Sequence, residues 1–205
     1  MEKRKFIKEY VEPILIAILI ALFIRAFIVQ AFKIPSSSME DTLLIGDHIL
    51  VNKFIYGIRI PFTDTKVFQF VKPRRGDVIV FVFPLDPSKD FIKRVIGTAG
   101  EKVKIVNREI YINDRPIADP WGHFESIGSA EYRHDIENFG PVIVPRDSLF
   151  VMGDNRNNSE DSRFWGFLRV NAVLGKAFVI YFSWDGHAAN LLDKVRWNRI
   201  GELLR

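Results

Sequence analysis

The sequence changes character at the stretch KIPSSSMEDTL, residues 33–43, which separates an apolar N-terminal segment from a region of β-type patterns. The only membrane-length apolar run of the sequence lies directly before this stretch. Pro35 fixes its own φ angle and favours an extended Ile34, so a helix that arrives from the membrane is expected to end near this point. Chemistry placed on the serines that follow would therefore lie at a bilayer surface.

The apolar run is predicted to cross a bilayer once. The segment from Pro13 to Phe32 would span about 30 Å as a helix, which is the thickness of the hydrocarbon core. Arg25 interrupts the run near its C-terminal end, where its long stem can reach outward to the interface. The expected organisation is a cytoplasmic basic N-terminus at 1–12, a transmembrane helix at 13–33 and an extracytoplasmic domain at 34–205.

Basic residues ahead of the run set the expected orientation: Lys3, Arg4, Lys5 and Lys8. The positive-inside tendency places this end in the cytoplasm and the rest of the chain after Lys33 outside. A cleavable signal sequence is an alternative, but residues 27–33 are bulky where a cleavage site needs small side chains. A buried core helix is a second alternative, and it leaves the basic cluster unexplained.

Composition excludes several classes of protein. With 205 residues, 48% hydrophobic and 26% charged, the chain can form one full domain with a modest insert. The net charge of +4 is explained by the N-terminal cluster, and no later basic run with interleaved aromatics indicates nucleic acid. Cysteine is absent, so neither a disulfide framework nor a thiol metal site is expected. The sequence carries no signal for an oligomeric state.

The chain after residue 43 is predicted to be mainly β, because helical periodicity is nearly absent outside the anchor. Short strands are expected at 48–55, 77–83, 91–96, 102–106, 108–112, 116–117, 141–144, 148–152 and 173–182. A hairpin followed by an irregular stretch indicates a small inserted lobe at about 107–143. Residues 191–204 are compatible with a short helix or with extended chain.

A serine in this stretch needs a base before it can act as a nucleophile. The histidines at 48, 123, 134 and 187 lie in no local motif of a Ser-His-Asp enzyme, and no Gly-x-Ser-x-Gly elbow exists. His48 opens a strand close after the serines, but a lone histidine is more often structural. The sequence contains no His-Glu-x-x-His motif of a zinc site, and Arg156 stands where a calcium-binding loop needs an oxygen ligand. No metal and no cofactor are predicted.

Lys93 is the alternative base. A free lysine titrates near 10.4, and burial among apolar neighbours can lower that value by up to roughly 3–5 units. Alternation along the predicted strand puts Phe91 and Val95 on the same face as Lys93. A fall of about two units in the pKa of its amine would leave a useful neutral fraction near pH 8. The competing interpretation is a lysine that reaches into solvent from a strand edge.

Four blocks, in this order, resemble type I signal peptidase, a membrane-anchored Ser-Lys endopeptidase that removes signal peptides from exported proteins. They are residues 34–50, RRGDVIVF at 74–81, DFIKRVIG at 90–97 and MGDNRNNSEDSRFWG at 152–166. The resemblance runs from about Phe27 to Leu204 and weakens between about Asn107 and Val142. It implies a signal-peptidase/LexA-like β fold, with the variable second β domain of the family reduced to the small lobe.

The resemblance also implies residue roles. Ser38 becomes the nucleophile and Lys93 the general base, while the Ser36 hydroxyl and the Ser38 backbone N–H form an oxyanion hole. Ser159 orients the lysine amine. Asp161 and Arg163 brace the loop around it, and Arg94 is a further candidate for this bracing. The family usually has a small residue such as glycine where Ser37 stands, so Pro35 and Met39 fix the register.

The family reads small side chains, typically alanine, at the first and third positions before the cut. The matching positions predict shallow apolar pockets formed by Phe32, Ile34, Pro35, Met39, Leu43, Ile49, Val80, Phe91 and Ile92. An extended substrate could add as a strand beside residues 34–36.

The expected function is therefore a signal peptidase at the bacterial plasma (inner) membrane, with signal-peptide-bearing preproteins and the lipid bilayer as partners. A specialised Ser-Lys peptidase with one dedicated substrate, or one that cleaves itself as LexA-type repressors do, is a second hypothesis. A catalytically silent membrane-anchored β domain that scaffolds export proteins is a third.

Overall fold

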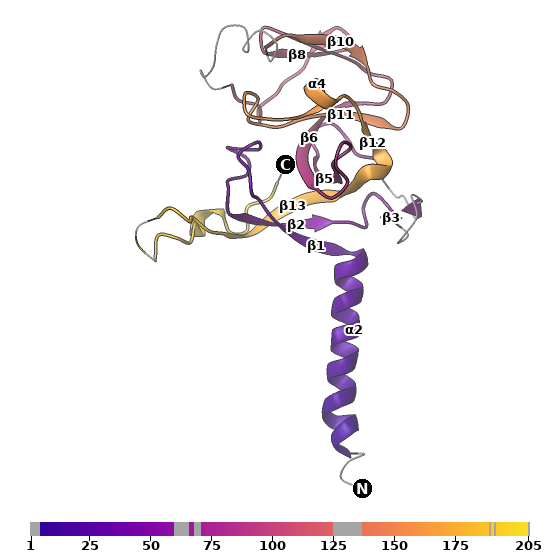
Figure 1. The fold of residues 1–205 in the computed structure, drawn as a ribbon, viewed down its shortest axis with the longest axis vertical. Helices are drawn as coiled ribbons and strands as arrows, with labels where there is room; N and C mark the ends of the chain where they lie inside the picture. The colour runs from indigo at the N-terminus through magenta and orange to yellow at the C-terminus, as the bar shows by residue number, and fades with distance from the viewer. Residues whose placement is uncertain are drawn as a thin grey trace.

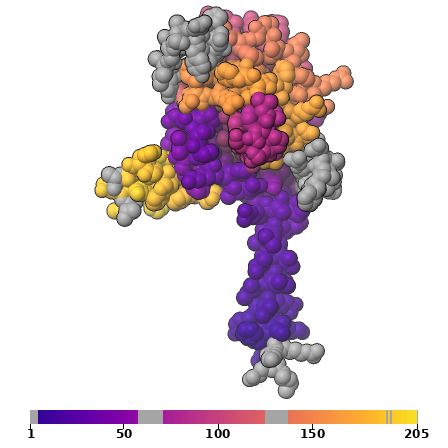
Figure 2. All heavy atoms as spheres, in the orientation of Figure 1, coloured from indigo at the N-terminus to yellow at the C-terminus, as the bar shows by residue number. Residues whose placement is uncertain are grey.

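The computed structural model describes residues 5–59, 66–67, 71–124, 137–188, 190 and 192–204. One long N-terminal helix extends from a body made of β-strands (Figure 1). In the space-filling view the helix stands clear of the body along most of its length (Figure 2). The prediction of a mainly β fold preceded by one apolar helix is confirmed.

The helix consists of η1 (Ile7–Val11), which has π geometry, and α2 (Glu12–Phe27). None of its described residues is buried, and an 18-residue window within Ile7–Phe27 has a mean hydropathy of 2.1. At 1.5 Å per residue these 21 residues span about 31 Å. Within the described part of the chain, it is the one helix long and apolar enough to cross a membrane.

The observed helix differs at both ends from the helix predicted at 13–33. Helical geometry begins before Pro13 and ends at Phe27. Residues Val29–Lys33 instead form strand β1, which pairs antiparallel with β2 (Asp47–Asn52). The apolar pattern alone could not show this end, because the pairing partner of β1 lies beyond the serine stretch.

The main sheet has seven strands in the order β1-β2-β13-β5-β6-β11-β12, and every neighbouring pair is antiparallel. The strands not yet given are β5 (Val78–Val82), β6 (Asp90–Thr98), β11 (Ser148–Met152), β12 (Leu168–Arg169) and β13 (Val173–Ser183). Strand β2 is shorter than the predicted 48–55, because the Asn52 side chain accepts the backbone N–H groups of Phe54 and Ile55 and turns the chain.

A second sheet forms the lobe that lies at the end of the molecule away from α2 (Figure 1). Its order is β10-β7-β8-β9, with bounds β7 (Lys102–Val106), β8 (Glu109–Ile112), β9 (Arg115–Pro116) and β10 (Phe139–Ile143). Strand β7 thus begins before the boundary predicted near 107. Residues 125–136 of the predicted lobe, with His134, lie outside the described residues.

The remaining elements are short. They are the strand pair β3 (Ile58–Arg59) and β4 (Lys66–Val67), the one-turn helix α4 (Ser162–Trp165), and the 3-10 turns η2 (Val170–Ala172) and η3 (Trp197–Arg199). Helix α4 was not predicted, because four residues carry no periodic pattern. The C-terminal stretch, for which a short helix or extended chain was considered, contains some of each: the 3-10 turn η3, and a bridge from Leu203 to β13 at Val179.

Candidate active site

The loop between β1 and β2 carries the three serines and is closed at both ends by backbone hydrogen bonds. The Ile34 N–H donates to Asp47 O at 2.8 Å, and the Gly46 N–H donates to Ile34 O at 3.0 Å. Met39 and Leu43 point into the core beneath the sheet and are fully buried. These anchors fix the two ends of the segment that carries Ser38 and tie it to the core.

The Ser38 hydroxyl meets the amine of Lys93, a residue 55 positions away in the sequence. Lys93 Nζ lies 2.7 Å from Ser38 Oγ. Lys93 is held by the pairing of β6 with β5, where it lies opposite Ile79. The exposed fraction is 3% for Lys93 and 8% for Ser38, so the pair is shielded from most solvent.

Burial lowers the pKa of the Lys93 amine from its ordinary value of 10.5 to about 8. The carboxylates of Asp161, Asp154 and Glu160 oppose the shift, and the Arg163 guanidinium adds to it. A buried ammonium loses hydration that the neutral amine does not need, which is why desolvation favours the neutral form. About half of the amine is therefore uncharged at pH 8 and can accept a proton.

A loop after β11 closes over this pair. The Gly153 N–H donates to Ser159 Oγ and to Asp161 Oδ2, both at 3.1 Å. Asp161 caps α4 by accepting the Arg163 N–H, and the Arg163 side chain donates to both Asp161 and the carbonyl of Arg156. Asp161 and Arg163 thus brace one continuous turn, 153–163, against residues 34–46, which are called the nucleophile loop below after the role predicted for Ser38.

Ser159 and Ser36 both lie beside the Ser38–Lys93 pair, but of these two described residues only Ser36 is hydrogen-bonded to it. Among the described residues, Ser159 Oγ has no hydrogen bond to the Lys93 amine, although both residues line one cavity. Ser36 Oγ lies 3.5 Å from Ser38 Oγ, and Ser36 is exposed at the rim. The two neighbouring loops are further joined by Asn158, whose side-chain amide donates to Ser37 Oγ at 2.8 Å.

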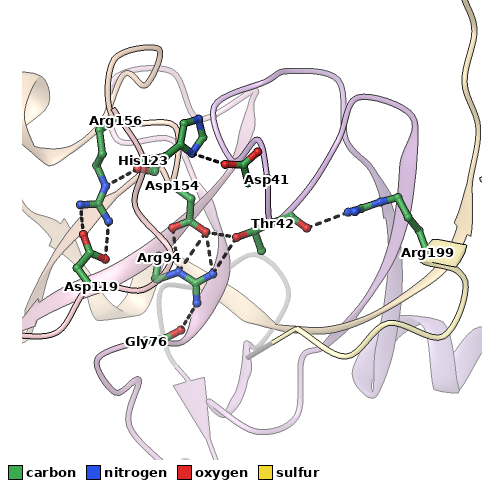
Figure 3. Close-up of polar contacts among 10 residues, drawn as sticks. Asp41, Thr42, Gly76, Arg94, Asp119, His123, Asp154, Arg156 and Arg199 are labelled. Carbon is green, nitrogen blue, oxygen red and sulfur yellow. Dashed lines mark hydrogen bonds and ion pairs between the residues drawn. The ribbon is translucent and has the colours of Figure 1, made fainter. Parts of the chain in front are cut away.

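Arg94 points away from Lys93 and pairs with Asp154 rather than with Asp161 (Figure 3). The shortest contact of this ion pair is 2.7 Å, and both side chains are fully buried. Thr42 Oγ1 donates to Asp154 as well, at 2.5 Å, and Arg94 donates to the Gly76 carbonyl. The prediction that Arg94 joins the Asp161–Arg163 pair is therefore corrected: adjacent strand residues face opposite sides of a sheet.

Sequence reasoning missed the partners in this network. Thr42 and Asp154 lie within the matched blocks, but spacing did not show which carboxylate an arginine would choose. The same holds for Arg199, which donates to the Thr42 carbonyl and to Asp47 from the far C-terminal segment (Figure 3). These contacts hold the C-terminal part of the nucleophile loop at Thr42 and at Asp47, which directly follows the loop.

Ser38 and Lys93 both line a cavity of about 530 Å³. The lining residues are Pro35, Ser36, Ser38, Asp90, Phe91, Ile92, Lys93, Asn158, Ser159, Glu160 and Phe164. Three of the predicted pocket residues are among them: Pro35, Phe91 and Ile92. The others belong to the core cluster below or pack against it, because they lie on inward faces: Phe32, Ile34, Met39, Leu43, Ile49 and Val80.

His48 and His123 lie in other surroundings. His48 packs edge-on against the rings of Tyr181 and Phe182, and His123 Nδ1 lies 3.1 Å from Asp41 Oδ2. Within the described part of the chain, Ser38 Oγ is hydrogen-bonded to Ser36 and Lys93 and to no histidine. A serine beside a partly neutral amine at an open cavity is an arrangement that can perform acyl transfer.

Comparisons with known proteins place the chain among the peptidases. The family model described as signal peptidase, peptidase S26, matches residues 7–184. The chain belongs to this family, and the predictions of a signal peptidase resemblance and of a hydrolase are confirmed.

Similar proteins cover most of the chain. Signal peptidase I of Pseudomonas aeruginosa is 37% identical, over 98% of this chain and 81% of its own length. Signal peptidase I of Aquifex aeolicus is 36% identical, over 86% of this chain and 84% of its own length. A crystal structure of a signal peptidase I from Enterococcus faecalis V583 is 29% identical, covers 52% of this chain and 97% of its own, and has a TM-score of 0.41.

Proposed function

We propose that this signal peptidase cleaves preproteins with a Ser38–Lys93 dyad, after small-x-small sequences, at the outer face of a bacterial plasma membrane. The observation that carries the proposal is the 2.7 Å contact between Lys93 Nζ and Ser38 Oγ at an open cavity. A scaffolding domain has no need of a buried lysine next to a serine, because burial of an amine opposes folding when the amine is charged.

In the first half of the reaction, Ser38 Oγ attacks the carbonyl carbon of the scissile peptide bond and its proton moves to the neutral Lys93 amine. The resulting ammonium then donates that proton to the departing amide nitrogen, and the C–N bond breaks. The signal peptide is left as an ester on Ser38. In the second half, water attacks the ester, Lys93 takes the water's proton and returns it to Ser38 Oγ, and the C–O bond to the enzyme breaks.

The oxyanion formed in each half needs hydrogen-bond donors. Two donors are available: the Ser38 backbone N–H, which has no hydrogen-bond partner among the described residues, and the exposed Ser36 hydroxyl. Such donors stabilise charge that appears only in the transition state. Ser159 lies within reach of the same cavity and, through Gly153, helps to keep the Lys93 side of the site in place.

Substrate enters the cavity as an extended segment beside residues 34–36, where a strand-like peptide gains backbone hydrogen bonds without sequence demands. Pro35, Phe91 and Ile92 give the cavity apolar walls, which suit the small apolar side chains before the cut. The predicted pocket residues in the core, such as Ile34 and Val80, set the depth of these walls from below.

Helix α2 anchors the enzyme, with the basic residues before it in the cytoplasm and the β body outside. The exposed apolar surface of α2 and the length of about 31 Å over Ile7–Phe27, which includes η1, support this placement. The active site then faces preproteins as their signal peptides emerge from the bilayer.

The decisive experiment incubates purified protein in detergent with a preprotein whose signal peptide ends in Ala-x-Ala. Wild type is expected to cleave after the second alanine, and Ser38→Ala and Lys93→Ala to lose turnover while retaining their fold. Ser37→Ala and Lys89→Ala are matched controls, since neither touches the Lys93 amine. Activity in Lys93→Ala together with its loss in His48→Ala would make histidine the base. Full activity in Ser38→Ala would leave only a scaffolding role.

A further inference from the structure

A short segment of the inserted lobe lies directly on the loop that follows β11. The segment comprises residues 119–123 and is called the strap below. The His123 N–H donates to the Asp154 carbonyl at 2.9 Å, and the Arg156 N–H donates to the His123 carbonyl at 3.0 Å. These two bonds make a parallel bridge between His123 and Asn155. The strap thus adds to loop 153–156 as a strand would.

The Arg156 side chain ties the two segments together. Its guanidinium is completely buried and makes a bidentate contact with the Asp119 carboxylate, in which Nη2 donates to Oδ1 at 2.9 Å and Nη1 donates to Oδ2. Its Nε donates to the Gly153 carbonyl at 3.0 Å. A Cβ atom at Gly122 would lie 2.2 Å from the guanidinium carbon, so a larger residue at this position would displace the guanidinium. One arginine therefore links Asp119 on the strap to Gly153 on the loop.

Two further contacts extend the strap over neighbouring parts of the site. The Trp121 ring lies 4.4 Å from the Arg94 guanidinium and packs on the face of Gly76, so it covers the buried Arg94–Asp154 ion pair. His123 reaches the nucleophile loop itself through Asp41. The strap therefore contacts the two fully buried arginines, Arg94 and Arg156, and both loops that form the site.

The loop under the strap is the loop that holds Ser38. The Asn155 N–H donates to the Ser38 carbonyl at 3.2 Å, and Gly153 packs against the same carbonyl. A shift of the loop would move Ser38 with it. Buried polar networks of this kind act as a unit, because each unpaired member left behind is costly. Misplacement of a reacting group by about 1 Å can lower a rate about 100-fold.

We propose that residues 119–123 are a positioning element of the enzyme, which holds loop 153–156 and thereby sets the geometry of Ser38 against Lys93. Asp119 is the main positioning residue, since it supplies the counter-charge for Arg156. The proposal rests on the proposed function of Ser38 and Lys93. It assigns a catalytic consequence to a lobe that contributes no group to the reaction.

The test compares Asp119→Asn with wild type in the full-length protein in detergent. The expected result is a fall in kcat of about 10- to 100-fold with KM changed by less than about threefold, because the cavity that binds substrate is untouched. Asp114→Asn is the matched control: it removes an acidic partner of an ion pair, with Lys102, in the same lobe and far from the loop. Asp119→Glu keeps the charge and is expected to recover most of the lost rate.

Hydrogen exchange gives a readout that does not depend on substrate. In Asp119→Asn the amides of 152–158 are expected to exchange at least about tenfold faster, while those of β13 exchange as in wild type. Unchanged exchange in 152–158, or equal acceleration in β13, would overturn the proposal. If Asp119→Asn does not fold, Trp121→Ala replaces it, because Trp121 is only half-buried. The same faster exchange of residues 152–158 is expected for Trp121→Ala. Wild-type exchange together with wild-type kcat in this variant would overturn the proposal.

The two proposals can fail separately. If the wild type does not cleave the Ala-x-Ala preprotein, or Ser38→Ala cleaves it normally, the proposed function is wrong, and the exchange measurement still decides whether the strap holds the loop. If Ser38→Ala is inactive and Asp119→Asn keeps wild-type kcat, the positioning role is wrong and the dyad stands.

Discussion

Gly153 lies so close to Ser38 that a Cβ atom added to it would come within 2.3 Å of the Ser38 carbonyl oxygen. The same atom would lie 2.3 Å from Ser159 Oγ. The turn after β11 therefore touches the nucleophile loop at a point where only a hydrogen atom fits. Backbone contact at this point, rather than a side chain, sets the distance between the two loops.

Gly153→Ala is accordingly expected to push the loops apart. Overpacking of this kind lowers the free energy of unfolding by about 1–3 kcal/mol, and preprotein cleavage is expected to fall by more than about 100-fold as Ser38 shifts. Chemical denaturation and a cleavage assay measure the two effects. Gly186→Ala is the control, because nothing lies within 4 Å of its added Cβ. Wild-type cleavage in Gly153→Ala would show that the contact does not position Ser38.

The lowered pKa of Lys93 predicts how stability depends on pH. Between pH 8 and 10.5 the unfolded chain binds more protons than the folded chain, so the free energy of unfolding should rise with pH over this window. Below pH 8 the full penalty for the buried ammonium applies, about 3 kcal/mol at 1.36 kcal/mol per pKa unit. Lys93→Met removes the penalty.

Denaturation of Lys93→Met and wild type at several pH values checks this expectation. The variant should be more stable than wild type at pH 7, by up to about 3 kcal/mol, and the difference should shrink towards pH 10.5. Lys89→Met controls for the loss of a lysine at an exposed position. A difference that does not vary with pH would mean that the Lys93 amine titrates normally.

The Arg94–Asp154 ion pair is predicted to be a major determinant of stability. Asp154→Asn leaves the fully buried Arg94 guanidinium without its counter-charge, and breaking a buried pair in this way typically lowers stability by about 3–5 kcal/mol. Asp86→Asn breaks an exposed pair with Lys89 and should change stability little. Thermal unfolding in detergent compares the two. Equal, small effects would mean that Thr42 and the Gly76 carbonyl suffice to hold Arg94.

Ser36 and Ser37 are predicted to differ sharply although they are neighbours. If the Ser36 hydroxyl stabilises the oxyanion, Ser36→Ala should lower kcat by about 10²- to 10³-fold with little change in KM. Ser37 Oγ instead accepts a hydrogen bond from Asn158, so Ser37→Ala should lower kcat far less. Steady-state kinetics on one preprotein separate the two. The reverse order of effects would place the oxyanion donor one residue later.

Local patterns predicted much of this molecule. Short apolar runs predicted β7 and β11 with their observed bounds, and the apolar neighbours of Lys93 in its strand predicted a lowered pKa for its amine. The serine stretch was expected at the end of the anchor. The serine stretch instead follows strand β1, because residues 29–33 pair with β2 and do not continue α2.

What the sequence did not predict depends on contacts between distant segments. The carboxylate that pairs with Arg94 is decided by the register of β6 against β11, and the contact of Arg156 with Asp119 by the path of the inserted lobe. Likewise, the family resemblance predicted Phe32, Met39 and Leu43 as pocket residues, whereas these residues pack in or against the hydrophobic core. Neither the register between strands nor the depth of a side chain below the surface is encoded in a local sequence pattern.

The pH dependence of kcat/KM for preprotein cleavage tests the proposed dyad most directly, because it reports the ionisation of the free enzyme. With Lys93 as the base, kcat/KM should rise tenfold per pH unit below pH 8 and level off above a single pKa of about 8. A profile that is already flat at pH 7, as a histidine base would give, would contradict proton transfer from Ser38 to Lys93.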